Sequence, residues 1–469
     1  MSKTNNDAVM AEFRERAKRP FGIRDKIGYA AGDFANDLTF VIAAMFMMKF
    51  YTDVMEVPGP LVGFLMMAAK VVDAFTDVAM GQIVDRSSYT AKGKFAPWIR
   101  RFAGPVAVAS FLIFAPYFAD KPMGFKIFWM FFTYLLWGSV CYTGVNIPYG
   151  SMASAISDDA TERTQLSTWR NIGATVAQII IVVILPLVVY VNNVLDGYRV
   201  MLASGVCSVL AILVYLVCYH LSTERVVIQN KKEEQKNVAQ LMKILFTDRA
   251  FLGIIISALF LLLAQLTLSN MMNYVFPNYF QNAKFLSVSG LVGCGIVLVL
   301  AMFSTKLAGR FGKKELAAGG AVVAAVSQFV VFVIHTHNIG LYIVIYCITY
   351  AGMAFFNLLC WAMIIDVIDE IEVKNNVRSD GTVYSVYSFA RKLGQAGSTG
   401  ISGVMLGIAG YSAKTQFDTD VVNSIYNLAT LVPAILFALM AASLLFIYPL
   451  TKKKVDDNVE TLRAKREGK

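Results

Sequence analysis

The chain consists mostly of long apolar runs that are separated by short polar stretches. Twelve runs reach roughly 20 residues, the length that a helix needs to cross a bilayer. The pattern therefore predicts an all-α membrane protein with twelve transmembrane helices. The expected helices are 27–50, 60–84, 97–118, 125–152, 167–193, 198–221, 249–273, 285–307, 315–336, 339–367, 382–408 and 423–448.

The longest polar break divides the twelve predicted helices into two groups of six. A Gly-rich basic loop follows the second helix of each group, GQIVDRSSYTAKGKFAPW in the first and GRFGKKELAAGG in the second. The repeat indicates a duplicated 6+6 transporter. The expected parts are an N-terminal tail, a six-helix bundle, a middle loop, a second six-helix bundle and a C-terminal tail, at residues 1–22, 23–221, 222–248, 249–449 and 450–469.

Composition and charge fit a membrane protein. Hydrophobic residues make up 57% of the chain and charged residues 16%, where a soluble domain carries about 25% charged residues. Lys and Arg gather in both tails and in the loops that follow the second and eighth helices, so both termini are expected to be cytoplasmic. This bias accounts for the net charge of +10 without a nucleic-acid partner. The six cysteines lie in apolar runs without metal-ligand spacing, and no structural metal is expected.

The second predicted helix carries Lys70, Asp73 and Asp77 in the middle of its apolar run. A charge at the bilayer centre costs about 2.5–3.5 kcal/mol, so these side chains must face the protein interior or a water-filled cavity. All three share one face of a helix with 3.6 residues per turn. Lys70 neutralises one carboxylate, and the other requires a proton or Na⁺. We interpret this face as a coupling-ion site; a structural Lys–Asp pair with one spare acid is the alternative.

The first predicted helix has a similar polar face with Asp33, Asn36 and Asp37. Carboxylate oxygens accept hydrogen bonds from sugar hydroxyls, and an amide both donates and accepts. Small residues within 28–35 allow neighbouring helices to approach closely. The face therefore predicts binding of a hydroxyl-rich ligand, and an interhelical polar clamp is the alternative.

Other predicted helices also carry polar groups at membrane depth. Thr143 and Asn146 lie one turn apart in the fourth helix. Arg170 lies about 9 Å into the fifth helix, and Arg391 and Lys392 lie about 15 Å into the eleventh. We interpret them as part of a transport site; salt bridges that close the two halves are the alternative.

An acidic cluster lies at the inner end of the tenth predicted helix. Its members are Asp366, Asp369, Glu370 and Glu372, and they face Lys374 and Arg378. We interpret the cluster as a cytoplasmic gate network. A solvated loop is the alternative.

Seven motifs, in order along the chain, resemble those of the glycoside–pentoside–hexuronide:cation symporters. They are GYAAGDFAND, FYTDV, VVDAFTDVAMGQIVDR, GKFAPW, NIPYGS, DDATERTQLSTWR and DGTVYSVYSFARKLGQAG. The resemblance covers about residues 22–450. It implies the major-facilitator fold, alternating access, and sugar uptake driven by Na⁺, Li⁺ or H⁺.

The resemblance also implies roles for single residues. Asp73 and Asp77 match the family's cation carboxylates, Thr143 matches a hydroxyl ligand, and Lys70 matches a neighbouring basic position. Thr76 stands where the family pattern has a cation-binding Asn. On the sugar side, Asp37 matches the acid that binds hydroxyls, and Arg170 and Lys392 match basic positions. Three residues differ from the family pattern: Asn36 replaces a Lys, Asn146 an Asp and Gly150 a Trp. Asp33 and Arg391 are extra charges that we expect to pair.

The expected protein is a symporter, and not an enzyme, in a bacterial inner membrane. It imports a glycoside, pentoside, hexuronide or related anionic sugar as a monomer without a cofactor. H⁺ is the expected coupling ion, because Thr76 offers one neutral oxygen where an amide would serve Na⁺; Na⁺ is the alternative. An anionic sugar is favoured over a neutral one, since Asn146 replaces an acid. A channel or a lipid or lysolipid transporter of the same fold is the alternative function.

Overall fold

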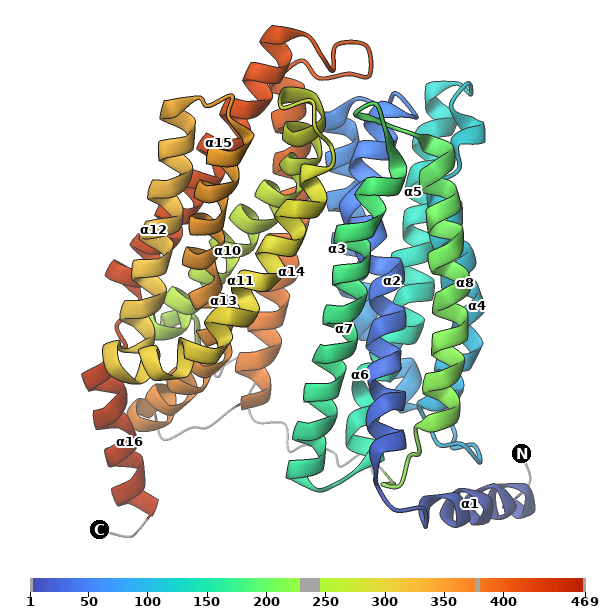
Figure 1. Cartoon of the computed structure of the whole chain (residues 1–469). Helices are drawn as coiled ribbons and strands as arrows, with labels where there is room; N and C mark the ends of the chain where they lie inside the picture. Colours follow the sequence, from blue (N-terminus) through green and yellow to red (C-terminus); the bar gives the residue numbers. More distant parts are fainter. Residues whose placement is uncertain (1–2, 228–244, 376–379, 467–469) are drawn as a thin grey trace. The chain divides into compact units, whose positions relative to one another are not determined.

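The computed structural model describes residues 3–227, 245–375 and 380–466. This part of the chain is helical except for short connections and one small hairpin. The chain forms two compact units, Met1–Lys232 and Glu233–Lys469 (Figure 1). The boundary between them falls inside 222–248, the polar segment that separates the two predicted groups of helices.

Unit 1 is built around α2, which packs against α7 and α8. Small residues permit close packing of α2: a Cβ on Gly173 of α7 would lie 2.1 Å from the Ala30 carbonyl oxygen, and one on Gly32 would overlap the ring of Tyr149 on α6. The small residues of the first predicted helix therefore act as expected. The elements of unit 1 are α1 (Lys3–Ala17), α2 (Ile23–Asp53), α3 (Gly59–Asp85), α4 (Ala96–Ile113), η1 (Pro116–Phe118), α5 (Met123–Leu135), η2 (Leu136–Tyr142), α6 (Thr143–Ile156), α7 (Ala160–Val189), β1 (Tyr190–Val191), β2 (Val194–Leu195) and α8 (Gly197–Leu221).

Unit 2 repeats the packing of unit 1. Its first long helix, α10, packs against α14 and α15, as α2 packs against α7 and α8. Helix α12 packs against α15, as α4 packs against α8. The elements of unit 2 are α10 (Arg249–Tyr274), η3 (Val275–Tyr279), α11 (Phe285–Phe311), α12 (Lys313–Ile334), α13 (Ile339–Asn375), α14 (Asp380–Ile408), α15 (Thr419–Ala442), η4 (Ser443–Ile447) and α16 (Lys452–Arg466).

Among the described residues, nine helices are long and apolar enough to cross a membrane. Helices α3, α4 and α14 are outside this set. Helix α3 carries Lys70, Asp73 and Asp77, and α14 carries Arg391 and Lys392. The all-helical membrane fold is confirmed, whereas the number of twelve spans stays a prediction.

Three elements differ from the sequence-based expectation. The tails at 1–22 and 450–469 contain the helices α1 and α16, and Figure 1 shows α1 running across the direction of α2. The fifth predicted helix does not continue to residue 193: α7 ends at Val189, and residues 190–195 form the β1–β2 hairpin. Asn192 and Asn193 have φ of 48° and 66°, values that Asn tolerates and that suit a tight hairpin turn.

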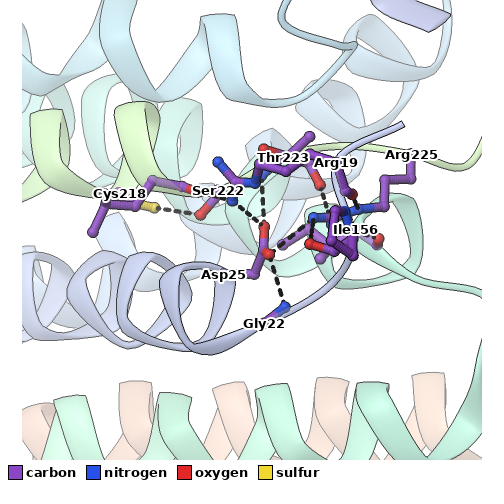
Figure 2. A network of polar contacts seen from close by, with 10 residues as sticks. Arg19, Gly22, Asp25, Ile156, Cys218, Ser222, Thr223 and Arg225 are labelled. Carbon is purple, nitrogen blue, oxygen red and sulfur yellow. Dashed lines mark hydrogen bonds and ion pairs between the residues drawn. The ribbon is translucent and has the colours of Figure 1, made fainter. Parts of the chain in front are cut away.

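The buried carboxylate of Asp25 connects the segment before α2 with the segment after α8 (Figure 2). Asp25, at the start of α2, is fully buried and pairs with Arg19 at 3.0 Å and with Arg225 at 2.9 Å. It also accepts the backbone N–H groups of Gly22 and Thr223. Arg225 donates further to the carbonyl of Ile156, at the end of α6. These contacts fix the segment after α8 to the start of α2 and to the end of α6.

A second carboxylate from the same segment caps α4. Glu224 is buried and accepts the backbone N–H groups of Lys94, Phe95 and Ala96 at 2.7–2.9 Å. These are amides that the first turn of a helix leaves without partners. Burial raises the pKa of Glu224 to about 7, and the three N–H donors oppose this shift. Gly93, at φ 113°, is required here because a Cβ would meet the carboxyl group.

Candidate functional site

The two carboxylates of α3 each accept a hydroxyl hydrogen bond from the neighbouring segment. Ser139 Oγ donates to Asp73 Oδ1, and Thr143 Oγ1 donates to Asp77 Oδ1 at 2.7 Å. Both carboxylates are half-buried. Carboxylate and hydroxyl oxygens together form a set that can hold a proton or a hard cation. The structure brings Thr143 to Asp77, two residues that the family resemblance assigns to the ion site, and it adds Ser139 at Asp73; ion binding by this set stays a prediction.

The backbone between the two hydroxyls has an unusual form. Residues Leu136–Tyr142 form the π-helical segment η2, a feature that is frequent at functional sites. Gly138 lies within it, and a Cβ at this position would be 3.2 and 3.3 Å from the two oxygens of Asp73. The absence of a side chain therefore allows α3 and η2 to approach at the carboxylate.

Lys70 precedes the two carboxylates on α3 and Thr76 lies between them, and the two residues have different environments. Lys70 Nζ lies 5.1 Å from the centroid of the Phe40 ring and 6.0 Å from that of Tyr134. Thr76 Oγ1 donates to the backbone oxygen of Asp73 at 3.2 Å. This bond is a local one along α3 and directs the hydroxyl hydrogen to the backbone. The predicted roles of both residues in ion binding stay predictions.

A second set of charges in unit 1 joins α2 to α7. Arg170 Nε donates to Asp33 Oδ2 at 3.1 Å, and the guanidinium lies over the Tyr149 ring at 5.4 Å. The Arg170 side chain is 37% exposed, whereas the Asp33 side chain is 12% exposed. Asp33 thus has a partner within its own unit, and a pairing with Arg391 stays a prediction.

Asp37 lies one turn along α2 from Asp33 and is half-buried. It makes no hydrogen bond or ion pair with any residue of the described chain, although Asp33 and Arg170 lie within electrostatic range. Its oxygens are therefore accessible to a ligand that brings its own donors. This arrangement suits the predicted contact between Asp37 and sugar hydroxyls.

Asn36 is engaged in the interior of unit 1. Its Nδ2 donates to Asn146 Oδ1 at 3.4 Å, and its Oδ1 accepts from the Tyr215 hydroxyl at 2.7 Å. The residue is 1% exposed. Asn36 and Asn146 therefore meet, but Asn36 is part of a clamp between α2, α6 and α8. These contacts are those of the interhelical clamp, Asn146 is half-buried, and sugar binding by either residue stays a prediction.

Unit 2 adds an aromatic group that the sequence does not single out. Trp361 on α13 is 46% exposed, stacks on Tyr384 at 5.8 Å and meets the edge of Tyr387 at 5.2 Å. Arg391 lies over the same Tyr387 ring at 5.8 Å, and Lys392 follows it, half-buried on α14. An exposed indole beside basic groups is a surface on which a sugar ring can stack.

The acidic cluster of α13 is divided between different partners. Asp366 pairs with Lys313 at 2.6 Å. Glu370 pairs with Lys374 and with Lys454, each at 2.7 Å, and accepts Asn458 Nδ2. The network therefore ties α13 to the start of α12 and to α16. Asp369 and Glu372 also make contacts, Arg378 lies outside the described residues, and a gating role stays a prediction.

Two similarly packed helical units with charged groups inside membrane helices define a multi-pass membrane transporter of the major-facilitator type. The chain belongs to the MFS/sugar transport protein family, whose model matches residues 28–452. This result confirms the predicted resemblance to the glycoside–pentoside–hexuronide symporters. Proteins of this family are transporters and not enzymes.

The similar proteins include carriers of several sugars. A glucuronide carrier protein homolog of Escherichia coli is 29% identical, with 93% of this chain and 94% of that protein covered. A putative sulfoquinovose importer of Salmonella typhimurium is 29% identical, with coverage of 95% and 93%. An isoprimeverose transporter of Lactiplantibacillus pentosus is 30% identical, with coverage of 90% and 88%.

Solved structures share the fold at low sequence identity. A bacterial homolog of the human lysosomal transporter Spinster has a TM-score of 0.67 at 10% identity, with 98% of this chain and 99% of that chain covered. A D-xylose–proton symporter has a TM-score of 0.57 at 14% identity, with coverage of 91% and 97%. These likenesses support the major-facilitator fold.

Proposed function

We propose that the protein couples the import of a sugar to the entry of a cation by alternating access. The observation that carries this proposal is the division of the unit 1 charges into two sets. Asp73 and Asp77 accept hydroxyls from η2 and α6, whereas Asp33 and Arg170 join α2 to α7 beside the open carboxylate of Asp37. Two separate polar sets provide one site for an ion and one for a sugar.

H⁺ is the coupling ion in this proposal, and Na⁺ is the alternative. Thr76 offers one neutral oxygen where the family pattern has an amide, so the set is poorer in ligands for Na⁺. A proton requires only one carboxylate, and two acids on one helix face favour the uptake of a positive charge.

The substrate in this proposal is an anionic sugar, a uronide or a sulfonated sugar. Arg170 keeps part of its side chain exposed while its Nε binds Asp33. A guanidinium binds carboxylate or sulfonate oxygens in a bidentate manner. Two of the three relatives named above are called carriers of a glucuronide and of sulfoquinovose, which supports this choice.

In this proposal both termini lie in the cytoplasm of a bacterial cell, and the protein acts as a monomer. The basic tails and the basic loop before α4 support this orientation. Protease protection of an epitope added to either tail, in right-side-out vesicles, tests it, and digestion from outside contradicts it.

Coupling is tested by uptake into proteoliposomes. Asp73→Asn and Asp77→Asn should each abolish sugar accumulation against a gradient while leaving measurable sugar binding. Asp120→Asn, which neutralises an exposed acid outside the helices, is the matched control. Full accumulation by either of the first two variants would contradict the proposal, and failure of labelled-sugar counterflow in the unmodified protein would favour a channel.

Substrate binding is tested by calorimetry with a neutral and an anionic sugar. Asp37→Ala should lose sugar binding, because each buried hydroxyl left unpaired costs about 1–3 kcal/mol. Alkalinisation of the outside medium on adding the anionic sugar would support both H⁺ as the coupling ion and an anionic sugar as the substrate. Strict Na⁺ dependence without a pH change would overturn the proton assignment, and transport of neutral sugars alone would overturn the anionic one.

A further inference from the structure

The ring of Phe40 connects the two polar sets of unit 1. Phe40 lies on α2 three residues after Asp37, so these two half-buried side chains share one helix face. On α3, Lys70 precedes Asp73 by three residues and likewise shares its face. Lys70 Nζ lies 5.1 Å from the centroid of the Phe40 ring. This contact therefore joins the helix of the proposed sugar acid to the helix of the proposed ion site.

The Phe40 ring also contacts η2. It stacks on the ring of Tyr142, with the two centroids 5.6 Å apart and the planes at 29°. Tyr142 is followed directly by Thr143, whose hydroxyl donates to Asp77. The Tyr142 side chain also lies within electrostatic range of both Asp37 and Asp77. The two stacked rings are therefore close to an acid of each polar set.

Lys70 is the part of this arrangement that can respond to a bound ion. Its ammonium is carried on a flexible stem of four carbons, and Nζ lies 6.0 Å from the centroid of the Tyr134 ring in addition to its contact with Phe40. An ammonium is attracted both to a carboxylate and to the face of an aromatic ring. A cation bound at Asp73 and Asp77 repels the ammonium and neutralises the carboxylates that attract it. The balance then shifts towards the rings.

A stronger contact between Lys70 and Phe40 stabilises the packing of α3 against α2. It holds the α2 face that presents Asp37 in the position seen in this structure. Sugar binding at Asp37 then requires less ordering of the protein, so the ion raises the affinity for the sugar. The effect is reciprocal, because a bound sugar must raise the affinity for the ion by the same factor.

We propose that Phe40, by holding the ammonium of Lys70, transmits ion binding on α3 to the sugar acid Asp37. Phe40 acts through Lys70 and is therefore a positioning residue. This inference rests on the proposed function, because it requires a sugar site on α2 and an ion site on α3. It adds a physical reason why the two separate sites respond to one another.

The test is calorimetric titration of the purified full-length protein with methyl glucuronide, sulfoquinovose and methyl xyloside. The dissociation constant of each sugar that binds is measured at high pH without Na⁺, at low pH without Na⁺, and at high pH with Na⁺. The coupling factor is the dissociation constant without the ion divided by that with the ion. Phe40→Leu should lower this factor towards one, by about 2- to 30-fold for the loss of one cation–π contact, and should change sugar affinity little when the ion is absent. Phe40→Tyr keeps an aromatic face and should retain the factor.

Phe21→Leu is the matched control, because it removes a ring that lies 5.6 Å from Lys26 Nζ and belongs to neither polar set. It should leave the coupling factor unchanged. A merely structural role of Phe40 would weaken sugar binding equally with and without the ion, so an unchanged factor in Phe40→Leu would overturn the inference. Lys70→Met should also lower the factor, and adding Phe40→Leu to it should lower the factor no further. Independent losses in the double variant would contradict a shared route.

Failure of this inference can be distinguished from failure of the proposed function. If the unmodified protein neither binds nor accumulates any of the three sugars, both are overturned. If it accumulates a sugar but has a coupling factor of one, only the inference is overturned. Phe40→Met removes the ring and fills a similar volume with a flexible side chain, so it provides the same test if Phe40→Leu lowers the thermal unfolding midpoint.

Discussion

The hydroxyl of Thr143 provides the sharpest test of the ion site. It donates to Asp77 Oδ1 at 2.7 Å from the first residue of α6. Thr143→Val removes the hydroxyl and keeps the volume and branching of the side chain. A hydrogen bond to a charged group contributes about 1.5–3 kcal/mol, so the substitution should change the affinity of the site for its ion by roughly 10- to 150-fold.

The direction of the effect identifies the ion. If the ion is H⁺, the carboxylate without its donor holds a proton to higher pH, and the pH profile of uptake should move upward by about one to two units. If the ion is Na⁺, an oxygen ligand is lost, and the Na⁺ concentration for half-maximal uptake should rise. Initial uptake rates in proteoliposomes over a grid of pH and Na⁺ concentration measure both quantities.

Two controls make the test decisive. Thr143→Ser keeps the hydroxyl and should behave like the unmodified protein. Thr430→Val in α15 removes a buried hydroxyl that donates to the backbone and should leave both profiles in place. Unchanged pH and Na⁺ profiles in an active Thr143→Val variant would refute the assignment of Asp77 to the ion site.

Three further predictions address other parts of the molecule. Gly138→Ala should reduce accumulation but not calorimetric sugar binding, because its methyl group would press on Asp73; loss of both would indicate general misfolding. Trp361→Leu should weaken sugar binding by about 2- to 10-fold in the same calorimetric titration, whereas Trp361→Phe should change it less. The thermal unfolding midpoint should fall as pH rises from 5 to 8, because the pKa of Glu224 is raised to about 7 and the stabilisation present below its ordinary value is lost through that range. Glu224→Gln cannot ionise and should flatten this profile; an equally steep one would contradict the assignment.

The fold could be predicted largely because bilayer thickness sets the length of an apolar helix. The same criterion missed α1 and α16, because they are polar helices in the tails. It also assigned the apolar residues of the β1–β2 hairpin to the preceding helix. Helices α3 and α14 are less apolar because they carry charged residues. Two of the three long helices outside the set of apolar spans, α3 and α14, thus carry proposed ion or sugar residues, whereas the third, α4, carries none.

The site could be predicted only as far as helical periodicity reaches. The spacing of 70, 73 and 77 places three charges on one face, and the structure adds a hydroxyl donor for each of the two carboxylates. Ser139 could not be chosen beforehand, because serines are common in membrane helices and its contact with Asp73 joins residues 66 apart. The pairing of Asp33 with Arg170 joins residues 137 apart and likewise depends on helix packing.

The contacts of the Asp25 carboxylate affect how unit 1 folds while the chain is being synthesised. Its partners Thr223 and Arg225 are synthesised about 200 residues after it, behind the last helix of unit 1. Until they emerge from the ribosome, α2 begins with an acid that lacks part of its compensating donors, and a buried charge without its partner costs about 3–5 kcal/mol. The packed form of unit 1 is therefore less stable until its final segment arrives, and a chain that stops before residue 223 would leave Asp25 with only Arg19 and the Gly22 N–H as partners.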